Sequence, residues 1–415
     1  MTARQPSTRP RVVAVGGGFA GLALVEGLAG ADVDVLLLDR NGYTTFQPLL
    51  YQVATGGLNP GDVIYALRAF VAGGDNARFR QAYVTEVDAT QRCVRTETGD
   101  EIAYDYLVLC CGATANYYGV PGAQEHASTI YTRRASLGVR DRVFGNLEAV
   151  AQGRADAAEP VVVVVGGGPT GVEMAGMLAE MRNAVPVVYP EVDLDRVRVV
   201  LVEMTDDVLG SFGVGVRGYA ARQLRRRGVE LRLGVAVAEV AEDHVVLEDG
   251  SRIPCATTIW ASGVRVDGRV GGWGLPQGRG GRIDVDPDMR VCGHRDVFAV
   301  GDVGAAVDSP LPQLAQPAIQ GGRHAAVQIR RLLDGRPTEP MQYRDRGTAA
   351  TIGRSAAVVQ FPQGWTVTGL IGWLAWLVIH IVALIGGRNR VATLVNLSAR
   401  YLSRQHGRLN VIVGD

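Results

Sequence analysis

Two glycine-rich turns of the same form constrain what this chain can fold into more than any other feature. The first, GGGFAG, occupies residues 16–21 and the second, GGGPTG, occupies residues 166–171. Each follows a short apolar run, at 11–15 and at 161–165, and each leads into a helical pattern. A buried strand, a tight glycine turn and a helix make up the first half of a βαβ unit. The repetition therefore predicts two such units in one chain.

Each unit continues into a second apolar run that is closed by an acidic residue. Residues 33–38 are followed by Asp39, and residues 197–202 are followed by Glu203. The pattern predicts an α/β protein with two separate Rossmann-like domains, not a single domain in which both motifs belong to the same fold. Three later apolar runs end in small polar turns, at 106–110, 257–260 and 296–300. The carboxyl ends of these strands are expected to face the ligand crevices.

The spacing of the glycines is typical of dinucleotide binding. In G-x-G-x-x-G the first glycine permits the sharp turn, the second lets the backbone approach a pyrophosphate, and the third lets helix and strand pack closely. We predict cofactor contacts at Gly16, Gly18, Gly21, Gly166, Gly168 and Gly171. One such motif in a chain with 54 glycines would also suit an ordinary turn. Two of them in strand–turn–helix context indicate a flavoprotein reductase.

The two acids at the strand ends are suited to ribose hydroxyls. Asp39 lies 18 residues after Gly21, although a solvated strand-end acid would look the same. Glu203 has no arginine close by in the sequence, so it would accept from a free 2′-hydroxyl and repel a 2′-phosphate. This favours NADH over NADPH. Glu203 lies 32 residues beyond Gly171, and residues 183–195 must therefore loop out as an insertion.

Three longer strings carry a resemblance to a known family. They are FQPLLYQVATG at 46–56, GPTGVEMAG at 168–176 and AQPAIQG at 315–321, and the likeness extends from about Arg11 to Val411. The chain resembles the type II NADH:quinone oxidoreductases. The resemblance implies a non-covalent FAD, NADH as donor and a membrane quinone, ubiquinone or menaquinone, as acceptor. It also implies a place in a respiratory electron-transport chain, attached to one membrane face and without proton pumping.

The resemblance also implies roles for individual residues. Gln316 and Gln320 would contact the quinone within an AQxAxQ string in which Pro317 is a variable position. Two glutamines four apart share one face of a helix and bring no charge into an apolar channel, although any polar helix face would read the same way. Asp302, which follows Gly301 after an apolar strand, would bind the flavin; a capping aspartate is the alternative.

The remaining candidate residues lie around the second nucleotide site and at two strand ends. Glu173 would lie near the nicotinamide, early in a helix whose dipole should stabilise its anion. An ordinary first-turn acid is the other interpretation. Gly112 and Gly263, in the turns after 106–110 and 257–260, complete the predicted cofactor-binding set.

The five cysteines argue against related enzymes of the same architecture. Disulfide reductases need a redox pair early in the chain, and residues 41–57 contain no cysteine. Sulfide:quinone oxidoreductases need cysteines poised at the flavin, whereas the cysteines here are expected to be buried, inert thiols. The histidines show no ligand spacing, so we predict no metal site.

The C-terminal region differs from the rest of the chain in charge and hydropathy. The sequence has 42 basic and 42 acidic residues, which disfavours nucleic acid as a partner, yet 346–414 contains seven arginines and no acid. The 21 residues 367–387 carry one ionisable side chain, His380, and a weaker amphipathic stretch follows. Trp365, Trp373 and Trp376 are expected to anchor an interfacial helix.

These tail features predict monotopic attachment through two helices to anionic lipids on the cytoplasmic face of the cell membrane. A single transmembrane span and a buried core helix are the alternatives, since 21 helical residues reach about 31 Å. We predict an FAD domain from 8–118 and 283–335, an NADH domain from 119–282 and a membrane-associating region from 336–415. A flavin- and NADH-binding redox sensor without turnover, or a reductase of a soluble acceptor, are the alternative functions, and a homodimer is left open.

Overall fold

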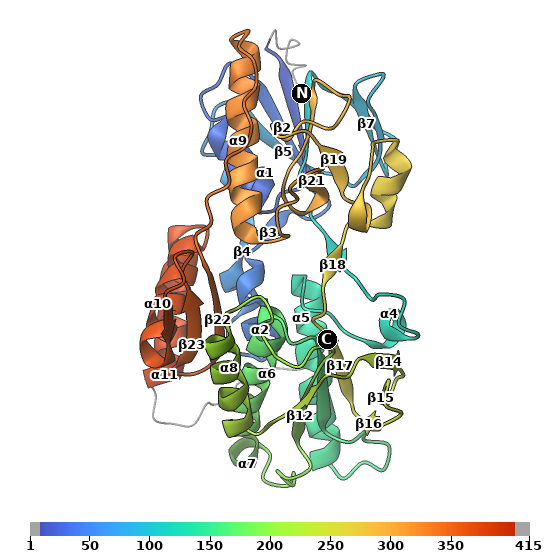
Figure 1. Cartoon of the computed structure of the whole chain (residues 1–415), viewed down its shortest axis with the longest axis vertical. Helices are drawn as coiled ribbons and strands as arrows, with labels where there is room; N and C mark the ends of the chain where they lie inside the picture. The colour runs from blue at the N-terminus through green and yellow to red at the C-terminus, as the bar shows by residue number, and fades with distance from the viewer. Residues whose placement is uncertain (1–8, 403–415) are drawn as a thin grey trace. The chain divides into compact units, whose positions relative to one another are not determined.

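The chain forms two compact units in the computed structural model, which describes residues 9–402 (Figure 1). Within these residues, unit 1 takes in 9–44, 65–114 and 264–345, and unit 2 takes in 45–64, 115–263 and 346–402. Each unit is built around a larger parallel β-sheet flanked by helices. The predicted α/β class with two Rossmann-like domains is confirmed.

Unit 1 is built on a five-stranded parallel sheet. In spatial order its strands are β20 (Val297–Ala299), β9 (Tyr106–Leu109), β1 (Arg11–Val15), β2 (Asp34–Asp39) and β5 (Ala77–Gln81). The central strand is buried on both faces, with Val12, Val13 and Ala14 fully inaccessible. An apolar run without alternation is what such a strand requires, because helices cover both faces of a parallel sheet.

Two helices of unit 1 that are far apart in the sequence pack tightly side by side. They are α1 (Phe19–Gly27) and α9 (Ala315–Leu333), as Figure 1 shows. A Cβ on Gly322 would lie 2.1 Å from the Ala20 carbonyl oxygen, and one on Gly27 would lie 2.6 Å from Ala326 Cβ. Glycines at these contacts therefore let the two backbones approach. The helix that follows the first glycine turn is thus held by residues that come about 300 positions later in the chain.

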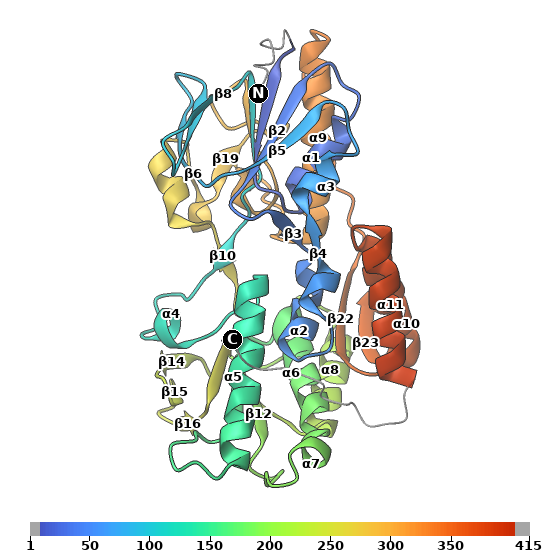
Figure 2. The same ribbon diagram turned by 180° about the vertical axis from the view of Figure 1, so that it is seen from behind.

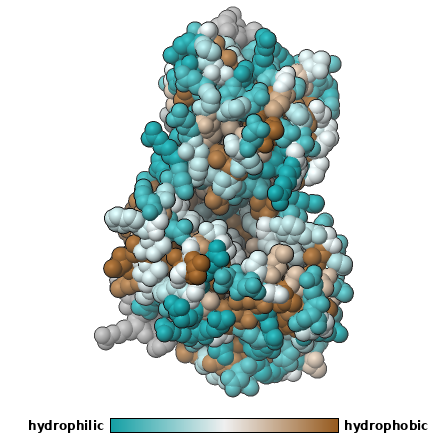
Figure 3. Space-filling view, in the orientation of Figure 1, coloured by the Kyte–Doolittle hydropathy of each residue, from teal (hydrophilic) through white to brown (hydrophobic). Residues whose placement is uncertain are grey.

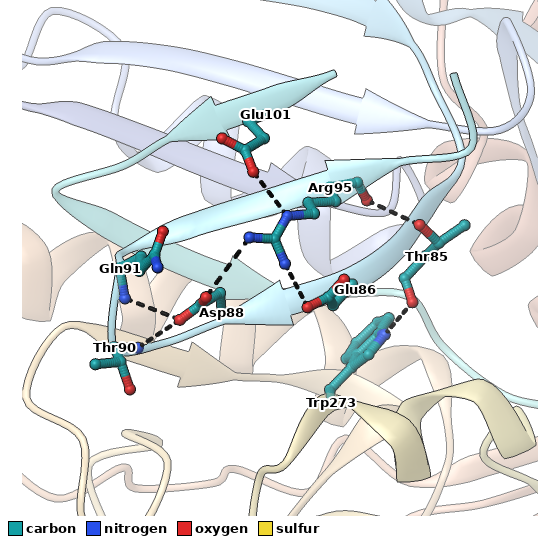
Figure 4. A network of polar contacts seen from close by, with 8 residues as sticks. All are labelled: Thr85, Glu86, Asp88, Thr90, Gln91, Arg95, Glu101 and Trp273. Atoms are coloured by element: carbon teal, nitrogen blue, oxygen red, sulfur yellow. Dashed lines mark hydrogen bonds and ion pairs between the residues drawn. The ribbon is translucent and has the colours of Figure 1, made fainter. Parts of the chain in front are cut away.

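A small antiparallel sheet and a 3₁₀ helix complete one edge of unit 1. The sheet consists of β6 (Val84–Asp88), β7 (Cys93–Thr96) and β8 (Glu101–Ala103). On its face Arg95 donates to Glu101 at 2.8 Å and to Glu86 at 2.5 Å (Figure 4). The Trp273 indole donates to the Thr85 carbonyl at 3.0 Å and thereby ties η3 (Gly268–Trp273) to β6. The remaining elements of unit 1 are α3 (Leu67–Val71), η4 (Arg279–Gly281), η5 (Gly301–Val303) and the parallel pair β19 (Ile283–Val285) and β21 (Gly304–Ala306).

Unit 2 contains a four-stranded parallel sheet of the same design. Its order is β13 (Val229–Leu233), β12 (Arg198–Glu203), β11 (Val161–Val165) and β17 (Thr257–Trp260). The helices α6 (Pro169–Arg182), α8 (Val214–Arg226) and α5 (Arg133–Ala151) pack against it, and Figure 2 shows α5 running alongside. The insertion at 183–195 forms the short helix α7 (Val185–Val188) and a loop, after which β12 pairs with β11 in register.

The smaller elements of unit 2 surround this sheet. They are η1 (Gln47–Leu49), α2 (Leu50–Ala54), η2 (Pro60–Val63), α4 (Ala123–His126) and the antiparallel strands β14 (Val237–Val240), β15 (His244–Leu247) and β16 (Arg252–Pro254). The chain passes between the units within three short strands, β3 (Tyr43–Thr45), β4 (Ile64–Ala66) and β10 (Thr114–Ala115), just before β18 (Val264–Arg265), and again after residue 345.

The C-terminal region adds a three-stranded antiparallel sheet and two helices to unit 2. The strands are β22 (Thr348–Gly353), β23 (Ala356–Gln360) and β24 (Thr366–Thr368), and the helices are α10 (Gly369–Ala383) and α11 (Gly387–Leu402). α6 packs on β22, where a Cβ on Gly176 would lie 2.4 Å from the Ile352 carbonyl oxygen. These compact units do not coincide with the three domains expected from the sequence, because 45–64 and most of the C-terminal region cluster with 115–263. The division into cofactor-binding domains stays a prediction.

The apolar run 367–387 does not form the single continuous helix that its length would allow. β24 ends at Thr368, α10 covers 15 residues, and the chain turns at Gly386 with φ of +84° before α11 begins. Of the helices in residues 9–402, none combines the length and apolarity needed to cross a membrane. The expectation of three interfacial tryptophans is also corrected. Trp373 and Trp376 are buried, and only Trp365 is exposed.

Candidate active site

The first glycine turn is shaped by contacts that leave no room for side chains. Gly16 has φ of +110°, and a Cβ there would lie 2.3 Å from the Cys110 carbonyl oxygen at the end of β9. A Cβ on Gly21 would lie 1.9 Å from the Gly16 carbonyl oxygen. At Gly18, by contrast, a Cβ would meet nothing within 4 Å. The turn therefore leaves open space in front of the first residue of α1.

The second turn repeats this geometry in unit 2. Gly166 has φ of +107° and a Cβ on it would lie 2.9 Å from the Ala261 carbonyl oxygen, at the end of β17. A Cβ on Gly171 would lie 1.8 Å from the Gly166 carbonyl oxygen, while Gly168 again faces open space. At both sites backbone N–H groups and the positive end of a helix border that space, which suits the pyrophosphate of a dinucleotide.

A carboxylate holds each turn in place. Asp39 at the end of β2 accepts from the N–H groups of Gly17 and Asn41, both at 2.7 Å. Burial raises the pKa of Asp39, while these two hydrogen bonds and Arg40 lower it. Glu203 at the end of β12 accepts from Gly167 N–H at 2.6 Å and from Thr205 N–H at 2.8 Å. Each acid is thus oriented beside the glycine turn where a ribose would lie, and the long spacing before Glu203 is absorbed by the insertion.

Asp302 follows Gly301, which packs against the helix of the first glycine turn and against α9. Gly301 has φ of +76°, and a Cβ on it would lie 3.2 Å from the Cβ of Ala318 and 3.4 Å from that of Ala20. Burial raises the pKa of Asp302 to about 6, and the positive charge of Arg282 opposes this shift. Gly112, in the turn after β9, has φ of +70° and open space around it.

Arg282 is a residue of this site that sequence reasoning missed. Its guanidinium donates to the carbonyl oxygens of Leu311, at 2.8 Å, and Gly304. Burial lowers the pKa of Arg282, and Asp302 raises it. A buried arginine among 42 basic residues carries no local sequence signal, so only the fold could reveal it.

The two glutamines of α9 differ in how far their amides are already engaged. Gln320 donates to the Arg344 carbonyl at 2.9 Å and accepts from the Arg344 N–H at 3.0 Å. Its amide also lies 3.5 Å from Gln316 Oε1. Both side chains are half-buried, on one face of the first turns of the helix, as the four-residue spacing predicts. Gln320 thus binds the backbone of the segment after α9, whereas Gln316 makes fewer hydrogen bonds.

Glu173 lies on α6 in a more apolar setting than the sequence suggested. Its side chain is buried, at 8% exposed, and the carboxyl accepts from the Thr351 N–H of β22 at 3.3 Å. Burial raises the pKa of Glu173 to about 8, while Thr351 and the side chain of Trp376 lower it. The expectation that the helix dipole would favour the anion is therefore wrong, because the cost of removing the charge from water is larger. Glu173 is half or more protonated near neutral pH.

Gly263 lies beyond β17 within a group of tyrosines. It has φ of +73°, its carbonyl accepts from Tyr131 Oη at 3.3 Å, and a Cβ on it would lie 2.1 Å from Tyr118 Oη. Tyr118 is 64% exposed with φ of +53°, a left-handed conformation that is unusual for an aromatic residue. No local pattern in the sequence singles out this tyrosine.

The five cysteines are all free thiols. Cys93, Cys110 and Cys255 are buried as expected, and burial is the main cause that raises the pKa of each thiol. Cys111 is exposed and Cys292 is half-buried, which corrects the expectation for these two.

Comparison with known proteins places this arrangement in a family. The family model for pyridine nucleotide-disulphide oxidoreductases matches residues 10–322. A type II NADH:quinone oxidoreductase of Mycobacterium tuberculosis is 35% identical over 98% of this chain and 91% of its own length. An internal alternative NAD(P)H-ubiquinone oxidoreductase of Arabidopsis thaliana is 31% identical over 94% of this chain and 83% of its own length.

Solved structures agree at the level of the fold. NDH2 from Plasmodium falciparum, solved in complex with NADH, aligns with a TM-score of 0.87 over 96% of this chain and 99% of its own at 17% identity. The sulfide:quinone oxidoreductase of Aquifex aeolicus aligns with a TM-score of 0.74 over 94% and 92% of the two chains at 18% identity. The paired glycine turns, their acids and these relationships confirm an oxidoreductase with FAD and NADH as cofactors, and the chain belongs to the type II NADH:quinone oxidoreductase family.

Proposed function

We propose that this chain oxidises NADH and reduces a membrane quinone, with FAD bound in unit 1 and NADH bound in unit 2. The observation that carries the proposal is the repetition of one site design, a glycine turn closed by a carboxylate, in both units. Two dinucleotide sites in one chain are what an enzyme needs to pass a hydride from one cofactor to another. The family's curated members, which are named for this activity, support the same reading.

The FAD and NADH sites have different tasks for their residues. Bound FAD supplies the chemistry of accepting a hydride and passing two electrons to a quinone. Gly18 and Gly168 leave the space for the two pyrophosphates, and Asp39 and Glu203 orient the riboses. The negative charge of Glu203 disfavours a 2′-phosphate, so NADH is the preferred donor.

Glu173 is proposed to hold and supply a proton. In the complete reaction NADH, a quinone and one proton give NAD⁺ and a quinol, so one proton must be taken up in each turnover. A buried carboxyl whose pKa is raised to about 8 carries such a proton at neutral pH and can release it to a reduced quinone oxygen. The carboxylate that remains is reprotonated from solvent. We propose that this proton uptake is not coupled to proton pumping, as the resemblance to the family implies.

Gln316 and Gln320 are proposed to contact the quinone. Their amides can donate to or accept from quinone oxygens without placing a charge in an apolar site. Because both Gln320 donor and acceptor atoms are engaged by Arg344, Gln316 has the greater freedom to bind the headgroup.

The helices α10 and α11 are proposed to attach the protein to an anionic membrane surface on the cytoplasmic face. They expose a set of large apolar side chains, part of which is visible in Figure 3: Leu370, Ile371, Leu374, Val378, Ile379, Val382, Val391, Leu394 and Val395. Arg388 and Arg390 are exposed beside them, and 346–414 contains no acid. An apolar face next to cations suits peripheral attachment to anionic headgroups. Arg404 and Arg408, which add to this charge, lie outside the described residues.

Steady-state oxidation of NADH by the purified protein, with and without a soluble quinone analogue, tests this function. The expected result is a yellow protein that releases FAD on denaturation and consumes NADH rapidly only when quinone is present. A flavin that is reduced by NADH but never reoxidised by quinone would instead favour a redox sensor. Turnover with a ferredoxin or oxygen that exceeds turnover with quinone would favour a reductase of a soluble acceptor.

A further inference from the structure

The buried face of α10 presents a tryptophan to Glu173. Trp376 is 1% exposed, and its Nε1 is buried without a hydrogen bond of normal geometry among the described residues. The same side chain lies close enough to the Glu173 carboxyl to lower its pKa. A buried indole N–H without an acceptor is costly, so a donor left in this state needs an explanation. The Glu173 carboxyl beside the indole accepts hydrogen bonds more strongly when it is deprotonated.

A histidine one helical turn later holds the indole in place. The ring of His380 stacks on that of Trp376, with centroids 4.2 Å apart and an interplanar angle of 26°. His380 Nδ1 lies 2.7 Å from the Trp376 carbonyl oxygen. Because a carbonyl oxygen only accepts, Nδ1 carries the hydrogen. Burial lowers the pKa of His380 to about 4, so the ring is neutral and remains stacked at physiological pH.

Other aromatic rings of unit 2 complete the surroundings of this pair. Tyr51 of α2 lies 6.4 Å from Trp376, and Phe46 lies edge-on to His380 at 6.3 Å, measured between ring centroids. The titratable groups that pack around Trp376, the side chain that approaches Glu173, are therefore His380 of α10 and Tyr51 of α2. On α6 itself, Glu180 lies two turns further on and accepts from the Arg354 N–H of the turn after β22.

We propose that Trp376 is a positioning residue for quinone reduction, whose indole N–H becomes the hydrogen-bond donor to Glu173 when that carboxyl gives up its proton. This inference rests on the proposed function. The protonated carboxyl needs only the Thr351 N–H, at 3.3 Å, whereas the carboxylate left after proton transfer gains from a second donor. His380 keeps the indole in the orientation in which that bond forms. A helix of the C-terminal region thus supplies part of the proton-handling site.

The experiment compares Trp376→Phe with wild-type holoenzyme. Phenylalanine keeps an aromatic ring against His380 and Tyr51 but removes the donor. The readout is the pH dependence of flavin reoxidation by a soluble quinone in stopped-flow, together with the infrared carboxyl signal of Glu173 titrated in the same proteins. If the indole N–H stabilises the carboxylate, the alkaline fall in the reoxidation rate and the infrared titration both move upward by about one pH unit in the variant. Flavin reduction by NADH stays unchanged.

Two further variants separate this role from simple packing. Trp373→Phe removes another buried indole of the same helix and should leave both titrations where they are. His380→Phe keeps a stacked ring but loses the bond to the Trp376 carbonyl, and a smaller upward shift is expected. Glu173→Gln should abolish the infrared band.

The proposal is overturned if Trp376→Phe retains its FAD and its melting temperature yet titrates like the wild type, or if Trp373→Phe shifts both curves equally. Should Trp376→Phe fail to fold, the His380→Phe titration decides in its place. A wild-type protein that reduces no quinone would refute the proposed function alone, because the infrared titration still reports on the contact between Trp376 and Glu173.

Discussion

At the scale of single residues, the same kind of side chain serves opposite purposes according to its surroundings. Asp39 and Glu203 end strands beside glycine turns, and each carboxylate accepts hydrogen bonds from backbone N–H groups of its turn. Glu173, an acid of the same chemistry, is buried between α6 and β22 and keeps its proton to a higher pH. For Glu173, the loss of contact with water outweighs the hydrogen bonds that its carboxyl accepts, and its pKa is raised for that reason.

Glu173 should make the stability of the protein depend on pH in a definite direction. Between about pH 4.5, the ordinary pKa of a glutamate, and about pH 8, the folded protein holds a proton that the unfolded chain has lost. The free energy of unfolding must therefore fall as pH rises through this window. Glu173→Gln cannot lose this proton, so the difference in melting temperature between the variant and wild type should increase in favour of the variant from pH 5 to pH 9. The corresponding change in the free energy of unfolding is on the order of a few kcal/mol. Calorimetry measures the melting temperature of each protein across this pH range, and Glu26→Gln, a change at an exposed glutamate, is the control. If wild type, Glu173→Gln and Glu26→Gln show the same dependence of melting temperature on pH, the pKa assigned to Glu173 is contradicted.

Glu203 should set the preference for NADH over NADPH. Glu203→Gln keeps the size of the side chain but removes the charge that repels a 2′-phosphate, so the ratio of kcat/KM for the two donors should fall about tenfold. Glu230→Gln, which removes an acid from the neighbouring strand β13, is the matched control. An unchanged ratio in Glu203→Gln would remove this carboxylate from the ribose site.

At the scale of elements, glycine contacts and small residues set where the helices lie. The approach of α9 to α1 through Gly322 and Gly27 brings the Gln316 end of α9 to the same unit as the first glycine turn. Gln316 thus belongs to unit 1 with the first glycine turn, whereas the second glycine turn belongs to unit 2.

Gln316→Leu should therefore separate the two half-reactions. Flavin reoxidation by quinone is expected to slow roughly tenfold through the loss of one hydrogen bond, while flavin reduction by NADH stays unchanged. Val327→Gln, an exposed site on the same helix, serves as control. Gln320→Leu is the less informative variant because it also frees the backbone of Arg344. Stopped-flow traces in which both halves of the reaction slow equally in Gln316→Leu would point to a damaged fold.

At the scale of the whole molecule, the C-terminal region has one buried side, which packs into the core of unit 2, and one exposed apolar side. Cutting the chain near Gln363 would remove β24 and α10 and uncover β23, so such a truncation would test folding rather than attachment. Point changes on the exposed apolar face avoid this difficulty.

Replacing Ile371, Leu374, Val378 and Val382 with serine should weaken binding to anionic vesicles. Each buried apolar side chain contributes roughly 1 to 2 kcal/mol, so the affinity should fall at least a hundredfold, and the remaining binding should be sensitive to salt. Serine at the exposed Val187, Val214 and Val307 is the control set. Cosedimentation with anionic vesicles, compared with neutral vesicles, measures the affinity of each protein for the membrane. Equal loss in both sets, or full-length protein that ignores vesicles of every composition, would remove α10 as the attachment surface.

Local sequence was enough to predict both nucleotide-binding units, because the strand, the turn and the helix of each depend on neighbouring residues. The apolar runs at 161–165 and 257–260 became β11 and β17 with the same boundaries, and both glycine turns have the predicted conformation. The protonation of Glu173 could not be predicted in this way, since Thr351 and Trp376 reach it from about 180 and 200 residues away. Arg282 beside Asp302 and the burial of Trp373 and Trp376 were hidden for the same reason. Hydrophobic periodicity reports which residues leave water, whereas the partner that each buried polar group meets is decided only when distant segments pack together.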